Sequence, residues 1–168
     1  SNLAKKLNFD DLRFVQGDIK GFNEFKNVDM VISLHACNTA TDDALATAVN
    51  WGAKVILAVP CCQHELLKKI KNKKMVPMLK YGIIKEKLSS LLTDSLRANV
   101  LEIMGYRTQV LEFIDMEHTP KNIMIRAFFE EISNVDKVVE EYKEFKKEWQ
   151  ISPYIEEAFG KGLTSKLE

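Results

Sequence analysis

The stretch VDMVISL at residues 28–34 is mostly apolar and rich in branched side chains, which is typical of a strand buried on both faces of a sheet. A second apolar stretch, KVILAV at residues 54–59, has the same character. Between them the sequence predicts a helix that Thr41 and Asp42 cap and that Gly52 ends. A strand, a helix and a strand within this span match a right-handed βαβ unit, so the sequence predicts a parallel α/β sheet.

The segments around this unit extend the predicted sheet. Leu12–Gln16 alternates between apolar and polar residues and predicts a strand, and Gln63–Lys71 predicts a short helix. Apolar residues at helical spacing predict a long helix from Ile84 to Ile103, which Gly105 ends. Two further strands, at 106–114 and 123–130, are joined by a short turn and should therefore be antiparallel.

The C-terminal region is predicted to be helical. Ser133 to Asp136 resembles a capping box before a helix whose apolar face includes Tyr142, Phe145 and Trp149, and this aromatic stripe is typical of core packing. Pro153 interrupts the pattern before a last short helix. We expect one domain over residues 1–132, with helices over residues 133–168 that pack on it.

The composition excludes several classes of protein. The chain has 168 residues, of which 46% are hydrophobic and 29% are charged, so a folded domain is expected rather than disorder. Basic and acidic residues are equal in number, at 24 each, so no overall charge attracts nucleic acid or a membrane. Three cysteines, with Cys61 next to Cys62, make a poor disulfide framework and favour a reducing, cytoplasmic compartment. Residues 1–7 read as the end of a helix already begun, so we expect a fragment.

Four short motifs occur in order along the chain: GDI (17–19), LHACNTATD (34–42), VPCCQH (59–64) and TPKN (119–122). Together with the order of the predicted elements, they resemble Rossmann-like S-adenosylmethionine (SAM)-dependent methyltransferases, in particular a subfamily with His-Ala-Cys-Gly and Pro-Cys-Cys signatures. The resemblance covers about residues 10–130 and implies the C-terminal portion of a seven-stranded sheet of order 3-2-1-4-5-7-6. In that sheet strand 7 is antiparallel. Asn38 stands where the subfamily has glycine, and asparagine tolerates the left-handed backbone better than most residues.

The resemblance also implies a cofactor site. Asp18 would accept a hydrogen bond from the adenine amino group, the Ile19 amide would reach a ring nitrogen, and Leu34 would lie beside them. The glycine-rich turn that holds the methionine end of SAM in the family has no G-x-G-x-G counterpart in this sequence. We therefore expect the chain by itself to bind SAM weakly or not at all and to be inactive alone. The strand at Leu12–Gln16 would then have no partner strand and could pair with another copy of the chain, giving a homo-oligomer.

Candidate catalytic residues follow the two apolar strands. Ligands of open α/β sheets bind at the carboxyl ends of the strands, so His35, Cys37, Pro60 and Cys61 should meet at one edge. His35 could orient a substrate nucleophile or take its proton; the alternative is a buried core histidine beside small buried cysteines. His118, Asn122 and Arg97 are the candidate substrate-binding residues.

Two alternatives remain for these residues. His35, Cys37, Cys61, Cys62 and His64 include good zinc ligands, but adjacent cysteines on an extended chain project to opposite sides, so the favoured reading has no metal. The second alternative is a non-catalytic interaction module on a methyltransferase scaffold.

Residues 68–87 contain eight lysines and one acid, Glu86. This segment could bind RNA phosphates, although such a run is more often a solvated surface. RNA or protein is the expected methyl acceptor, and a small molecule remains open.

Overall fold

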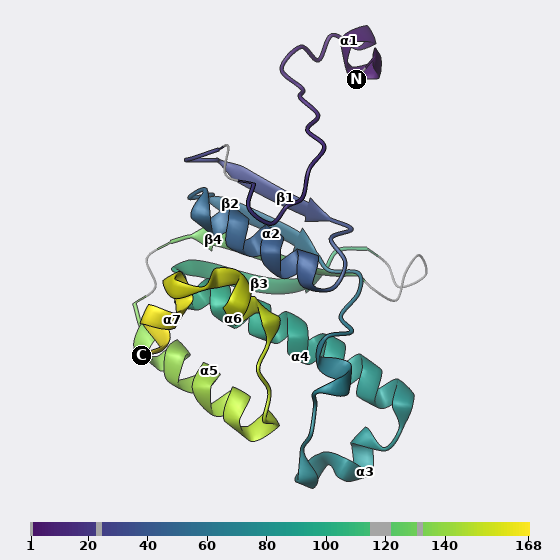
Figure 1. Cartoon of the computed structure of the whole chain (residues 1–168), viewed down its shortest axis with the longest axis vertical. Coiled ribbons are helices and arrows are strands. Elements are labelled where there is room, and N and C mark those ends of the chain that lie inside the picture. Colours follow the sequence, from purple (N-terminus) through teal and green to yellow (C-terminus); the bar gives the residue numbers. More distant parts are fainter. Residues whose placement is uncertain (1, 23–24, 115–121, 131–132) are drawn as a thin grey trace.

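The computed structural model describes residues 2–22, 25–114, 122–130 and 133–168, and Figure 1 shows how the elements are arranged. The N-terminal part contains α1 (Asn2–Lys6), β1 (Met30–Leu34), α2 (Thr39–Asn50) and β2 (Val55–Val59). Two 3-10 turns, η1 (Leu66–Lys68) and η2 (Lys73–Met75), lead to α3 (Val76–Leu79) and the long α4 (Gly82–Ile103). The chain continues through β3 (Tyr106–Glu112), β4 (Ile123–Phe129), α5 (Val135–Trp149), α6 (Tyr154–Phe159) and α7 (Lys161–Leu167).

The four strands form one open sheet in the order β1-β2-β4-β3. β1 and β2 are parallel, with Met30 opposite Val55 and Leu34 opposite Val59. β4 is antiparallel to both β2 and β3, so β1, β2 and β3 run in one direction. The predicted α/β class is confirmed, and the order is the one expected for strands 4-5-7-6 with strand 7 reversed.

The core lies on one face of this sheet, where α2 and α4 cover the strands. Ile56 and Ala58 of β2 and Ile125 of β4 are fully buried there, against Leu45 of α2 and Val100 of α4. The predicted apolar face of the C-terminal helix is confirmed as core, because Tyr142 and Trp149 join the same cluster. Helices α5 to α7 thus contribute side chains to the same hydrophobic core as the sheet. A domain boundary at residue 132 stays a prediction.

The other face of the sheet is partly open at β1. Ile32 and Leu34 are 58% and 60% exposed, and Met30 projects to the same side. The prediction that this strand is buried on both faces is wrong. β1 lies at the edge of the sheet, and helix α2 covers only the face that carries Val31 and Ser33. An apolar strand sequence therefore does not guarantee burial on both sides.

Several local predictions also need correction. Residues 12–16 form no strand and are exposed, because no neighbouring strand offers hydrogen bonds to them. The predicted helix at 63–71 is only the 3-10 turn η1. α2 begins earlier than predicted, with Asn38 rather than Thr41 at its N-cap, and α5 has Asn134 at its N-cap without a side-chain bond. The long helix, the antiparallel pair and the break at Pro153 are confirmed. Among the described residues, no helix combines the length and apolar character needed to cross a bilayer.

Candidate functional site

Two loops leave the sheet side by side at the carboxyl ends of β1 and β2. Leu34 and Val59 are paired at the ends of the two strands, so the first cysteine loop (residues 35–38) and the second cysteine loop (residues 60–65) start as neighbours. The parallel register places them there, because equal strand ends must meet at one edge. The structure thus brings together the four candidate catalytic residues His35, Cys37, Pro60 and Cys61 on these two loops.

The three cysteines of the chain gather at this edge. Cys37 Sγ lies 3.3 Å from Cys61 Sγ, and the sulfur atoms of Cys37, Cys61 and Cys62 all lie within 4.8 Å of one another. All three are free thiols; Cys37 is exposed and the other two are half-buried. The expectation that Cys61 and Cys62 project to opposite sides is wrong, because β2 ends at Val59 and the chain is no longer extended when it reaches them.

The first cysteine loop has an unusual backbone. His35 and Asn38 have φ angles of 58° and 54°, a region that non-glycine residues rarely adopt. The His35 carbonyl accepts a hydrogen bond from Cys37 Sγ at 3.7 Å, and the His35 side chain is exposed rather than a buried core histidine. Backbone strain of this kind concentrates at functional sites, and it supports a functional reading of the loop.

Asn38 joins the two loops through its backbone and its side chain. Its amide donates to the Cys62 carbonyl at 3.0 Å, and its Oδ1 accepts from the backbone amides of His64 and Glu65 at 3.2 and 3.1 Å. Glycine at this position would relieve the backbone but would lack the side-chain bonds. The departure from the family pattern therefore stabilises the pairing of the loops.

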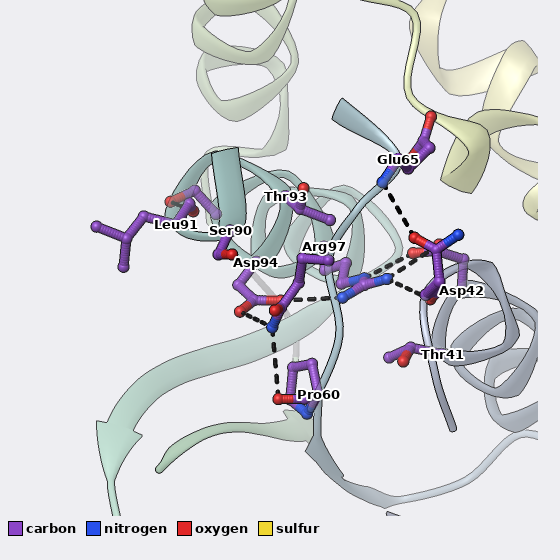
Figure 2. A network of polar contacts seen from close by, with 12 residues as sticks. Thr41, Asp42, Pro60, Glu65, Ser90, Leu91, Thr93, Asp94 and Arg97 are labelled. Carbon is purple, nitrogen blue, oxygen red and sulfur yellow. Dashed lines mark hydrogen bonds and ion pairs between the residues drawn. The ribbon is translucent and has the colours of Figure 1, made fainter. Parts of the chain in front are cut away.

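Arg97 of α4 lies behind both loops and is buried, with 1% of its surface exposed (Figure 2). Its Nε and Nη2 donate to the Asp42 carboxylate at 2.7 and 3.1 Å, and its Nη1 donates to Asp94 Oδ1 at 3.0 Å. Nη2 also donates to the Asn38 carbonyl at 2.7 Å. The prediction that Arg97 contacts substrate needs correction: it faces protein groups and positions the first cysteine loop.

The second cysteine loop is attached to the same network by Gln63. Its Nε2 donates to Asp94 Oδ2 at 2.8 Å and reaches the Pro60 carbonyl at 3.4 Å. Gln63 Oε1 is buried and has no hydrogen-bond partner among the described residues. One guanidinium cannot neutralise two buried carboxylates, and burial raises the pKa of Asp94 to about 6. Burial also raises the pKa of Asp42, although Arg97 opposes this shift.

The candidate cofactor residues lie elsewhere. Asp18 and Ile19 line a cavity of about 420 Å³ with Phe22, Phe25 and Trp51. The Ile19 and Phe22 carbonyls accept hydrogen bonds from Thr47 Oγ1 and Trp51 Nε1 of the segment that ends α2. Asp18 Oδ1 accepts a bond from the Lys20 amide, which is ordinary turn chemistry.

The cavity and the cysteines lie toward opposite ends of α2. Thr39 and Thr47 are separated by about 12 Å along a helix, and none of the residues that line the cavity belongs to the cysteine loops. The structure therefore does not bring Asp18 and Ile19 to the edge where His35 and Cys37 lie. Leu34 does lie at that edge, at the exposed end of β1.

β3 ends and β4 begins at the same edge of the sheet, because β3 runs parallel to β2. Asn122 is 3% exposed, and its Nδ2 donates to the Ile114 carbonyl at 2.8 Å, so its amide closes the base of the hairpin. A substrate contact by Asn122 stays a prediction. His118 lies outside the described residues.

Comparison with known proteins gives one family. Residues 1–69 match the model of a family described as a methyltransferase domain. No curated protein and no solved structure matches the chain. The matched residues contain β1, α2, β2 and both cysteine loops, which are the elements that form the edge described above. Residues 1–69, which make up less than half of the chain, are thus similar to a methyltransferase domain.

Proposed function

We propose that this protein transfers a methyl group from SAM to an acceptor that meets the carboxyl edge of β1 and β2. The observation that carries the proposal is the meeting of His35, Cys37, Pro60 and Cys61 on two loops held in a fixed relation. The family match and the sheet order with its reversed β4 support it.

The edge offers groups suited to positioning an acceptor. SAM supplies an electrophilic methyl group on a positively charged sulfur, so the protein needs to align the acceptor and remove its proton. Alignment of the reacting atoms provides most of the rate in such a transfer. The exposed imidazole of His35, on a strained loop, is the group that we assign to orient the acceptor or take its proton.

The chain supplies only part of a cofactor site. The Asp18 cavity is lined by aromatic and apolar side chains together with Arg13 and Thr47. The Asp18 carboxylate could accept a hydrogen bond from the exocyclic amine of adenine. The sequence has no glycine-rich turn for the methionine end, and the cavity is remote from His35 along α2. We therefore propose that the chain by itself holds SAM weakly, through the Asp18 end.

Methyl transfer tests this function. The protein, in the form in which cells make it, is incubated with labelled SAM and separate pools of RNA, protein and small molecules. We expect incorporation into one pool, and His35→Gln should lower the rate about 10²–10⁴-fold if the imidazole takes the proton. His64→Gln, on the second cysteine loop, serves as the control and should retain activity. No transfer into any pool would contradict the proposal.

Calorimetric titration of the chain alone tests the cofactor contact. SAM should bind with an affinity weaker than micromolar, and Asp18→Ala should weaken it further. The control is Asp29→Ala, which removes an exposed carboxylate that pairs with Lys54. Micromolar affinity, or equal effects of the two substitutions, would show that the assignment of Asp18 is wrong.

We propose RNA as the acceptor class. Lys71, Lys73, Lys80 and Lys85 line a second cavity of about 470 Å³, whose apolar wall includes Val76 and Leu79. Figure 1 shows α3, which carries Val76 and Leu79, beyond the N-terminal part of α4, in the region that the chain enters after the second cysteine loop. Lysines around the cavity suit the phosphate backbone of RNA, because affinity that does not depend on sequence comes from such charges.

Binding of labelled single-stranded RNA tests this acceptor class by fluorescence anisotropy. Affinity should fall as salt rises, and Lys71→Glu with Lys80→Glu should weaken binding and reduce the salt slope by about 1.4, because two phosphate contacts are lost. Lys161→Glu with Lys166→Glu on α7 makes the same change in net charge and should have a smaller effect. Equal effects of the two pairs would indicate only a general charge effect, and a protein acceptor would then be favoured.

A non-catalytic interaction module is the second candidate function. The separation of the Asp18 cavity from His35 along α2 favours it, because one compact active site is not formed by the described residues. The same assays separate the two functions: a module would bind RNA or protein and transfer no methyl group. Three free thiols favour a reducing, cytoplasmic compartment in either case.

A further inference from the structure

We propose that Cys37, Cys61 and Cys62 form a three-thiolate site for Zn²⁺, with a fourth coordination position open to solvent. The site goes beyond methyl transfer and does not depend on it. Its basis is the convergence of three sulfur atoms from two loops whose relative position is fixed by a buried network.

The spacing of the sulfur atoms is close to what zinc requires. Zinc–sulfur bonds of about 2.3 Å in tetrahedral geometry place pairs of sulfur atoms about 3.8 Å apart. The closest pair, Cys37 Sγ and Cys61 Sγ, is 3.3 Å apart, and all three atoms lie within 4.8 Å of one another. Side-chain shifts of less than about 1 Å would therefore complete the coordination.

The chemistry of the cluster points to a soft or borderline cation. Thiolates select zinc over magnesium and calcium, which prefer oxygen ligands. No histidine or carboxylate within the described part of the chain adds a fourth atom to the group. Cys37 is exposed, so a water molecule or a ligand can reach the cluster from solvent. Three protein ligands with an open position are the arrangement of catalytic rather than structural zinc.

The residues behind the cysteines hold the two loops in place. Asn38 bonds to the Cys62 carbonyl and to the amides of His64 and Glu65, and Gln63 bonds to Asp94. Arg97 connects the hydrogen bonds of Asn38 with those of Gln63, because it donates to both Asp94 and the Asn38 carbonyl. Outer groups of this kind orient metal ligands and reduce the ordering that binding would otherwise require.

Zinc titration of the reduced chain tests the proposal. The chain is first stripped with a chelator, and Zn²⁺ is then added in competition with a chromophoric chelator. We expect one ion per chain, bound at sub-micromolar dissociation constant. Each of Cys37→Ser, Cys61→Ser and Cys62→Ser should weaken binding at least tenfold, and circular dichroism should show that each variant is folded. His64→Ala is the control and should bind zinc as the parent does.

Thiol reactivity gives a second readout. Because the chain has three cysteines, all of them in the cluster, Zn²⁺ should protect all three from a thiol reagent, and Co²⁺ in its place should give thiolate-to-metal charge-transfer absorption. Asn38→Gly should weaken zinc binding about tenfold, because the two loops lose the hydrogen bonds from the His64 and Glu65 amides to Asn38 Oδ1.

Three results would overturn the site: no thiol protection, binding that survives the cysteine substitutions, or an equal loss in His64→Ala. The measurements need neither SAM nor an acceptor, so their failure would leave the methyl-transfer proposal standing.

Discussion

Arg97 is the residue on which the geometry of both cysteine loops depends. It is 1% exposed and lies between Asp42 and Asp94, with a further bond to the Asn38 carbonyl. Its planar guanidinium presents several donors in fixed directions, which an ammonium group cannot reproduce. Loss of the guanidinium is costly, because the buried carboxylates of Asp42 and Asp94 would then have no neutralising partner.

Substitution of Arg97 should therefore destabilise the fold strongly. Arg97→Met should lower the free energy of unfolding by about 3–5 kcal/mol, and Arg97→Lys should lower it less. The measurement is urea unfolding followed by circular dichroism. The control is Arg107→Met, which removes an exposed pair with Glu130 and should cost less than about 1 kcal/mol. Equal costs for Arg97→Met and Arg107→Met would contradict the role of the network.

Among the elements, β1 has the least conventional environment. Its outward side chains, Met30, Ile32 and Leu34, are large, apolar and exposed. One edge of the strand pairs with β2, and its other edge pairs with no strand among the described residues. Unpaired edges with apolar side chains promote association between copies of a chain.

The chain should accordingly self-associate through β1. Light scattering should show a mass that rises with concentration, and Ile32→Lys should reduce it, because a charge on an edge strand opposes pairing. Ile83→Lys, on an exposed position of α4, is the control and should have little effect. If the unsubstituted chain keeps the mass of a monomer at all concentrations tested, then β1 does not promote association. Pairing through residues 12–16 stays a prediction that the same experiment addresses by deletion of those residues.

At the scale of the whole molecule, the buried carboxylates make stability depend on pH. Burial raises the pKa of Asp94 from an ordinary 3.8 to about 6. The folded chain therefore binds more protons than the unfolded chain between these values. Where the folded state holds the extra proton, stability falls as pH rises. The stabilising contribution of protonated Asp94 is thus present at acid pH and is lost as pH rises through about 4 to 6.

Urea unfolding over this pH range checks the sign. The stability of the parent chain relative to Asp94→Asn should fall by up to about 3 kcal/mol as pH rises from about 4 to 7. Asp29→Asn is the control: because Lys54 lowers the pKa of exposed Asp29 below its ordinary 3.8, the stability of the parent relative to Asp29→Asn should stay nearly constant from about pH 4 to 7. If the parent instead becomes more stable relative to Asp94→Asn as pH rises, then Arg97 keeps Asp94 ionised in the folded chain.

Much of the sheet follows from local sequence. The apolar stretches at 28–34 and 54–59 and the length between them predict the parallel pair, and the short turn before Ile123 predicts the antiparallel one. The position of His35 and Pro60 at one edge of the sheet follows from the same argument, because parallel strands end at one edge. These features depend on hydrophobic periodicity and on chain geometry, which the sequence carries directly.

The buried network needed the tertiary structure. Asp94 and Arg97 stand three residues apart on the apolar side of a long helix, and this was the available signal that charged groups there are buried and paired. Their partner Asp42 is 55 residues from Arg97, and no local pattern connects them. Spacing likewise suggested that Cys61 and Cys62 diverge, because that argument assumes an extended chain.

Local patterns along the chain thus predict the parallel pair, the hairpin and the edge at which the candidate residues lie. The exposure of β1, the burial of Arg97 among protein groups and the convergence of three thiols emerge only from the folded chain. The difference lies in the range of the forces involved. Periodicity and turn chemistry act over a few residues, whereas burial and ion pairing depend on which distant segments fill the space around a group.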